Sequence, residues 1–206
     1  MAPSTEVTES FSLFSGAEGG LDEAAVERLL DASVAIPEYP RIAVLMAPDA
    51  LSQSYRYYGM TEQQLGAREA YLDTLRAQLL PAGAREVDLL PSLLVPANPT
   101  VPVLREVAVR LQVDVLLVFR VGGGLFQNYR AFRSDQLKAY ATCEAVLLDV
   151  RTGAIPFTTV ATRDYQTTRQ DGDLNDAETR QRAEQRAVLL ALGAMGREVA
   201  AYLGER

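Results

Sequence analysis

The chain has 206 residues, of which 48% are hydrophobic and 23% charged, and its net charge is -7. This composition is ordinary for a folded protein, and the length allows one domain with a real core. The acidic balance and the lack of a long basic run argue against nucleic-acid binding by phosphate neutralisation. With no histidine and one cysteine, the sequence excludes histidine-based triads, an internal disulfide and a thiolate zinc cluster.

The start of the chain differs in composition from the rest. Residues 1–20 are rich in Ser, Thr, Glu and Gly, which favours a flexible tether. We expect a single domain over residues 21–206. The first residues lack the basic region and apolar core of a secretory signal, and we expect no span of the apolar length that crosses a bilayer.

The first half of the domain is predicted to alternate helices with short strands. Residues 21–32 favour a short helix, since apolar residues recur at helical spacing and acidic residues lie in the first turn. Residues 41–46 form an apolar run that predicts a buried strand. Thr61 is suited to cap the next helix, which ends at Pro81 and Gly83. The apolar side of that helix consists of Leu65, Leu72, Leu75 and Leu79.

The middle of the chain repeats this alternation. Residues 85–90 predict a second strand, and the segment from Pro91 to Pro99 predicts an irregular loop. Pro102 lies near the start of a further helix, where proline is tolerated. The apolar row of this helix is Leu104, Val107, Ala108 and Leu111.

The most informative stretch runs from residue 113 to residue 165. Residues 113–119 predict a strand buried on both faces, and we expect the glycines at 122–124 to end it. Residues 139–148 alternate between two faces with period two, and residues 149–153 close a hairpin in which glycine supplies a positive φ. Residues 155–165 then return as a strand. One face of the second strand is small enough for close helix packing, and consists of Ala139, Ala141, Cys143, Ala145 and Leu147.

The order of these elements predicts the fold class. A long helix over residues 176–203, with Val188, Leu192, Met195 and Val199 as one apolar row, completes the chain. The sequence β-α-β-α-β needs right-handed crossovers between parallel strands, and the hairpin adds antiparallel strands. We therefore expect an α/β protein, a single domain with a mixed sheet and a C-terminal helix.

Two segments have partial ligand-binding patterns. Gly122-Gly123-Gly124 follows a strand, as in a phosphate-binding turn, but no helix opens there and no P-loop lysine is present, so a flexible hinge is favoured. Asp171, Asp173 and Asn175 have the alternate spacing of a calcium loop. The glycine and the glutamate that complete such a loop are missing, which favours a solvated loop before a helix. We expect no metal and no cofactor.

Single chemical groups offer few catalytic candidates. Cys143 lies on the small face of a core strand and is interpreted as a buried, unreactive hydrophobic residue. Asp114, Glu144 and Asp149 are acids associated with strands, and no pattern brings them together. We expect Asp114 to meet a helix end or an exposed edge, and Glu144 to face solvent.

Two loops are the candidate binding surface. The first parallel strand leads into one of them, and the third leads into the other through Arg120. Because the carboxyl ends of parallel strands meet at one edge of an open sheet, both loops are predicted to lie where such folds bind ligands. Tyr and Arg are suited to recognition. The alternative is that both are ordinary loops whose aromatic side chains pack back on the domain. The candidate residues are Tyr55, Arg56, Tyr57, Tyr58, Arg120, Tyr129, Arg130, Phe132 and Arg133.

The strand pattern resembles a group of bacterial envelope domains. The run Leu111-Gln112-Val113-Asp114-Val115-Leu116-Leu117-Val118, and later Glu144 to Leu148 followed by Asp149-Val150-Arg151-Thr152-Gly153, is similar to domains of the CsgG, LpoB and TolB amino-terminal type and to rhombotarget-type lipoproteins. The likeness covers most of residues 41–203. It implies a periplasmic protein, anchored in the outer membrane through a lipid and lacking its signal here.

The resemblance implies a non-enzymatic function. We expect a regulator or assembly factor that contacts an envelope protein or a peptidoglycan-associated partner, with no nucleic-acid partner and with membrane contact only through the lipid anchor. One alternative is a hydrolase-like enzyme that uses the Tyr and Arg loops and an acid such as Asp114 or Glu144. Another is a structural subunit that forms homo-oligomers through exposed strand edges.

Overall fold

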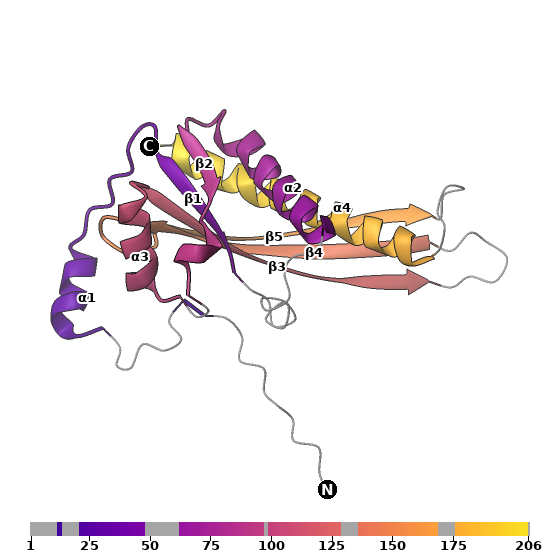
Figure 1. Ribbon diagram of the computed structural model, residues 1–206, viewed down its shortest axis with the longest axis horizontal. Helices are drawn as coiled ribbons and strands as arrows, with labels where there is room; N and C mark the ends of the chain where they lie inside the picture. The colour runs from indigo at the N-terminus through magenta and orange to yellow at the C-terminus, as the bar shows by residue number, and fades with distance from the viewer. Residues whose placement is uncertain are drawn as a thin grey trace, which may run out of the picture.

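The protein is an α/β domain built on a mixed sheet of five strands in the order β2-β1-β3-β4-β5 (Figure 1). A computed structural model describes residues 12–13, 21–47, 62–96, 99–128, 136–168 and 176–205. The strands are β1 (Arg41–Met46), β2 (Glu86–Leu89), β3 (Val115–Asn128), β4 (Gln136–Asp149) and β5 (Phe157–Thr168). The helices are α1 (Glu23–Leu30), α2 (Glu62–Leu79), α3 (Val101–Arg110) and α4 (Asp176–Gly204), with a short 3-10 helix at Ser92–Leu94.

The pairing of the strands confirms the predicted fold class. β1 is parallel to both β2 and β3, whereas β3, β4 and β5 form an antiparallel meander. The predicted single-domain α/β arrangement with an added hairpin and a C-terminal helix is therefore correct. The hairpin turn is also as predicted, since Gly153 has a φ of 81° and the carboxylate of Asp149 accepts the backbone N–H of Thr152 at 2.9 Å.

The sheet separates two hydrophobic clusters. On one face α2 and α4 pack over the strands, and the fully buried residues there include Leu75, Leu117 and Met195. On the other face α3 covers only the end of the sheet where β1 and β2 lie, and Leu104 of α3 and Leu116 of β3 are buried between the helix and the sheet. The domain therefore has three layers at one end and two layers at the other (Figure 1).

Helix α4 packs on the predicted small-residue face of β4. Ala139, Ala141 and Cys143 are completely buried, and α4 presents alanines to the same cluster. Small residues on both elements allow the helix to lie close to the sheet. The alanines of α4 that are completely buried are Ala183, Ala187 and Ala191.

The expectation about membrane-spanning length needs correction for α4. By length and composition alone, Glu178–Gly204 is a helix long and apolar enough to cross a membrane. The same helix packs along β4 and β5 and contributes Leu192 and Met195 to the core. Burial against the sheet thus accounts for its apolar character.

The sequence predicted that the glycine run ends the third strand and forms a hinge, and both predictions are wrong. β3 continues through Gly122, Gly123 and Gly124 to Asn128, paired throughout with β4. A Cβ atom on Gly123 would lie 2.7 Å from the carbonyl oxygen of Tyr140, and one on Gly124 would lie 2.6 Å from the Tyr140 hydroxyl oxygen. These two glycines therefore accommodate the neighbouring strand and the tyrosine ring that covers Gly124.

Part of the predicted tether contacts the domain. Ser12 and Leu13 are the described residues within 1–20, and Leu13 is buried in the cluster beneath α3. Its neighbours in that cluster include Leu45, Leu90 and Leu104. The helix that follows the tether, α1, has no buried residue, although Asp22 caps it by accepting the backbone N–H of Ala25 at 2.7 Å.

Candidate interaction surface

The antiparallel meander extends well beyond β1 and forms an arm whose two faces differ (Figure 1). We define the arm as β3 from Arg120 onward together with the parts of β4 and β5 that pair with it. α4 covers one face of the arm. On the other face, called the open face below, no helix in the described part of the chain lies over the strands, and Tyr140 and Val160 are 48% and 65% exposed.

The open face is ordered by contacts between neighbouring strands. Directly opposite residues in an antiparallel pair share a face, so each rung can be taken from the strand register. The rungs on this face are Gly124–Tyr140–Asp164, Gly122–Thr142–Thr162 and Arg120–Glu144–Val160. The hydroxyl groups of Thr142 and Thr162 lie 2.9 Å apart and form a hydrogen bond.

Charged pairs flank this row of hydroxyl and aromatic groups. The guanidinium of Arg120 donates to the carboxylate of Glu144 at 2.6 Å, and the ammonium of Lys138 lies 3.1 Å from the carboxylate of Asp164. All four side chains are partly exposed, so the pairs are screened by water and ions. In the described residues the open face is thus mostly polar and locally neutral, and Tyr140 and Val160 are its exposed large hydrophobic residues.

Arg120 is the one candidate binding residue from the sequence that the structure describes. It was expected at the exit of the third strand, but it lies inside β3, eight residues before the strand ends. Its ion pair with Glu144 depends on the β3–β4 register, which the sequence did not indicate. Glu144 itself is exposed, as predicted.

The other eight candidate residues lie outside the described residues, so the predicted loop surface stays a prediction. These residues are Tyr55, Arg56, Tyr57, Tyr58, Tyr129, Arg130, Phe132 and Arg133. The strand ends that precede the two loops are described: β1 ends beside Phe119, whereas β3 runs on to Asn128. Nine further residues of strand separate these ends by about 30 Å.

The acids proposed for the enzymatic alternative do not converge. Asp114 accepts the backbone N–H of Arg41 at 2.9 Å, at the amino end of β1. Glu144 lies on the arm and is paired with Arg120, which is six residues along β3 from Asp114, or about 20 Å of extended chain. Asp114 therefore lies at the amino ends of the parallel strands, whereas the loop that follows β1 starts at their carboxyl ends.

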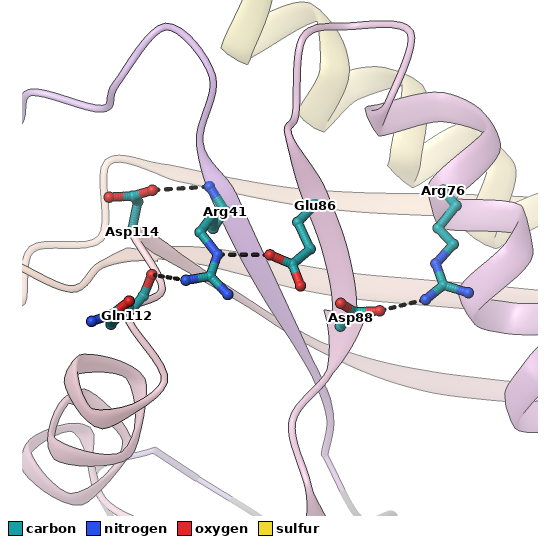
Figure 2. A network of polar contacts seen from close by, with 6 residues as sticks. All are labelled: Arg41, Arg76, Glu86, Asp88, Gln112 and Asp114. Atoms are coloured by element: carbon teal, nitrogen blue, oxygen red, sulfur yellow. Dashed lines mark hydrogen bonds and ion pairs between the residues drawn. The ribbon is translucent and has the colours of Figure 1, made fainter.

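A second polar cluster ties the amino ends of the parallel strands together (Figure 2). The guanidinium of Arg41 donates to Glu86 at 2.7 Å and to the carbonyl oxygen of Gln112 at 3.1 Å. Gln112 has a positive φ of 55°, which turns the chain between α3 and β3. Since these donors are satisfied by β2 and by the α3–β3 turn, the cluster joins neighbouring elements.

Arg76 plays the same part on the outer side of β2 (Figure 2). Its Nε atom donates to the carbonyl oxygen of Val87 at 2.9 Å, and its Nη2 atom pairs with Asp88. Arg76 therefore anchors α2 to the short edge strand. We interpret the cluster of Figure 2 as structural for this reason.

Cys143 is the buried residue that the sequence suggested. Its side chain is fully buried, and burial raises the pKa of the Cys143 thiol to about 12. Burial, followed by the nearby Cys143, also raises the pKa of Tyr71. Since the thiolate is the reactive species, burial and the raised pKa disfavour Cys143 as a nucleophile at neutral pH.

Metal ligands are likewise not assembled in the described regions. Within them, no group of three or more Cys, Asp or Glu side chains lies close enough to hold a metal ion. The weak calcium pattern at Asp171, Asp173 and Asn175 lies outside the described residues, and α4 begins directly after it at Asp176.

Comparison with known proteins gives low similarities. No family model matches the chain, and no curated protein matches it. A PelC dodecamer from Paraburkholderia phytofirmans is 16% identical, with 84% of this chain and 94% of that chain covered and a TM-score of 0.38. A minor lipoprotein from Acinetobacter baumannii is 9% identical over 80% of this chain and 94% of that chain, with a TM-score of 0.40.

A third solved structure is similar to the same degree. A lipoprotein from Neisseria meningitidis is 15% identical, with 81% of this chain and 99% of that chain covered and a TM-score of 0.35. At such identities and TM-scores, none of the three structures assigns a family or a function to this chain.

Proposed function

We propose that this domain is a non-catalytic binding domain of the bacterial cell envelope, lipid-anchored and acting as a regulator or assembly factor through protein or cell-wall contact. The observation that carries the proposal is the open face of the arm. A regular three-stranded surface is supported by its strand pairing and by α4, yet it presents Tyr140 and Val160 to solvent. Mostly polar surfaces with exposed aromatic residues suit contact with a macromolecule.

The envelope setting rests on the sequence. The strand that ends in Asp149-Val150-Arg151-Thr152-Gly153 and the run at Leu111 to Val118 resemble envelope lipoprotein domains, which are held at the outer membrane and face the periplasm. In this setting the predicted tether of residues 1–20 joins the domain to its anchor, and Leu13 within it is buried against the domain. The predicted Tyr and Arg loops, including Tyr57 and Arg130, add to the same proposal as further contact residues.

Site-specific photocrosslinking in cell envelopes tests the contact. A photoreactive phenylalanine analogue replaces Tyr140 or Val160 on the open face, and in a matched control it replaces Glu69, which is exposed on α2. We expect one shared crosslinked product at both open-face positions and its absence at Glu69. Equal crosslinking at all three positions, or none at the open face, would contradict the proposal.

Lipid labelling tests the setting separately. When the gene is expressed with its own start, we expect incorporation of a labelled fatty acid and recovery of the protein with the outer membrane. Recovery in the cytosolic fraction without label would contradict the envelope part of the proposal. It would leave the crosslinking result to judge the binding surface by itself.

The oligomeric alternative is the second candidate, and one observation favours it. β3 extends past β1 and leaves nine residues from Arg120 to Asn128 with a free edge among the described residues. The enzymatic alternative has no comparable support, since Asp114 and Glu144 are held apart and each has a partner within the chain.

A further inference from the structure

Among the described strands, one edge of β3 has no partner along the arm. Met46 at the end of β1 pairs with Phe119, and the backbone N–H of Ala47 donates to the carbonyl oxygen of Phe119 at 2.7 Å. Beyond this point β3 keeps β4 on one side only. Among the described strands, none pairs with Arg120–Asn128 on the side where β1 has ended.

The direction of the free backbone groups follows from the hydrogen bond at Phe119. In a regular strand the N–H and C=O of one residue point to the same side, and the side alternates with each residue. The Phe119 carbonyl points toward β1, and the register with β4 is continuous from Val115 to Asn128. The residues whose backbone groups point to the free edge are therefore Val121, Gly123, Leu125 and Gln127.

From Val121 onward this edge lacks the charges and the covering helix that protect the other edge of the arm. From Val121 to Asn128 the sequence contains no charged residue and no proline. The outer strand β5, in contrast, contains Arg163 and Asp164 and has α4 packed against it. Charges, prolines and covering helices are the usual means by which exposed strands avoid pairing with other chains. Of the two edges of the arm, the free segment of β3 is thus the one open to a further strand.

No described residue requires a glycine at position 122 for steric reasons. A Cβ atom added there would meet nothing within 4 Å, whereas the same atom would contact Tyr140 at both Gly123 and Gly124. A glycine inside a strand weakens it and often marks a place where another backbone or a ligand approaches closely. Gly122 shares the open face with Gly124 by the β4 register.

We propose that two copies of this chain associate through antiparallel pairing of their free β3 edges. The register that uses the whole free segment has its twofold axis at Gly124. In it Arg120 lies opposite Asn128 of the second copy, and Gly122 lies opposite Phe126. A glycine opposite an aromatic residue is the pair that Gly124 already forms with Tyr140 inside the chain.

This self-complementarity indicates that the partner strand at the free edge comes from a second copy of the same chain. In the proposed register no charged residue of the segment lies opposite a like charge. The odd-numbered residues, whose backbone N–H and C=O groups point to the free edge, lie opposite each other and can therefore exchange backbone hydrogen bonds. The nine-residue segment of one copy fills the step left by the end of β1 in the other. Since each copy uses the same edge, the pair is closed and does not extend into a fibre. The pairing rests on the same free edge as the oligomeric alternative above and gives it a register, and it does not depend on the proposed contact through the open face.

Light scattering and sedimentation of the full chain test the pairing. We expect a concentration-dependent rise toward twice the 22.5 kDa of one chain. Gly122→Lys places a charge in the segment without a steric conflict in the monomer, and it should shift the species to the monomer. The control Val160→Lys adds the same charge to the open face on β5 and should leave the mass distribution unchanged. A monomer at every concentration, or an equal loss with Val160→Lys, would overturn the proposal.

A second measurement guards against misfolded variants. Amide hydrogen exchange of the unaltered chain should show Val121, Gly123, Leu125 and Gln127 becoming protected as the protein concentration rises. The β5 residues Val160 and Thr162, which lie at the other edge of the arm, should show no such change. Concentration-dependent protection at β5 instead of β3, or at neither edge, would overturn the proposal.

Discussion

The two ends of the sheet differ in how many of their faces are covered, and the composition of the strands follows that difference. Where α3 and the α2–α4 pair enclose the sheet, β3 consists of Val115, Leu116, Leu117, Val118 and Phe119, all of them buried. Along the arm the same strand contains Arg120 and three glycines. A single strand therefore changes from a core element to a surface element where its second covering layer ends. This contrast is the reason for proposing an interaction surface on the arm.

The largest expected effect comes from the enclosed end. Leu117→Ala removes a completely buried side chain beneath α2 and α4, and we expect it to lower the free energy of unfolding by about 3 kcal/mol. On the arm, Thr162→Ala should cost about 0.5 kcal/mol or less because that side chain is exposed. Urea denaturation of both variants measures the difference. Equal losses would contradict the distinction between the two ends.

Gly123 and Gly122 are expected to differ in their importance for the fold of the monomer. Gly123→Ala places a Cβ atom 2.7 Å from the carbonyl oxygen of Tyr140, and we expect a loss of roughly 1–3 kcal/mol in the free energy of unfolding. Gly122→Ala meets nothing within 4 Å and should be neutral or slightly stabilising. Thermal unfolding monitored by circular dichroism compares them. A cost at Gly122 as large as that at Gly123 would show that both glycines serve the fold of the monomer.

The covered face of the arm can be probed through its cysteine. Burial raises the pKa of Cys143 to about 12 from its ordinary value of 9.0, so the folded state keeps the proton that the unfolded state releases. Stability from this group is fully present below pH 9.0 and falls as the pH rises toward 12. Cys143→Ala should make the decline in melting temperature over that range shallower. Rapid modification of the native thiol by a thiol reagent at neutral pH would contradict the burial.

The smallest expected effect lies on the open face. Arg120 and Glu144 form an ion pair at 2.6 Å, but their side chains are 39% and 49% exposed, and water and salt screen the attraction. A double-mutant cycle with Arg120→Ala and Glu144→Ala should give a coupling free energy of roughly 0.2–1 kcal/mol that weakens with salt. A larger, salt-independent coupling would mean that a further layer buries this face.

Much of this contrast was predictable where local patterns agree with the fold. The small face of β4 and the turn at Gly153 each have a single physical interpretation, and both were confirmed. The buried strand predicted at residues 113–119 was confirmed for residues 115–119. The end of β3 was predicted wrongly, because a glycine run signals a break in local terms. Pairing with the fourteen residues of β4 outweighs that local signal.

The candidate site was less predictable because it depends on register. Arg120 meets Glu144 only when β3 and β4 are paired in one particular alignment, and residues 24 positions apart give no local indication of it. The free edge arises in the same way, from β1 ending nine residues before β3. Neither the strand register nor this difference in strand length is encoded in a motif.

Residue-resolved amide exchange along β3 at low protein concentration tests directly whether this edge of the strand is free. We expect alternation from Val121 to Asn128: fast exchange at Val121, Gly123, Leu125 and Gln127, whose N–H groups face the free edge, and slow exchange at Gly122, Gly124 and Phe126, which bond to β4. Residues 115–119, between two strands, should be slow throughout. Uniform protection along the whole of β3 in the isolated monomer would contradict the free edge and the pairing of two copies proposed through it.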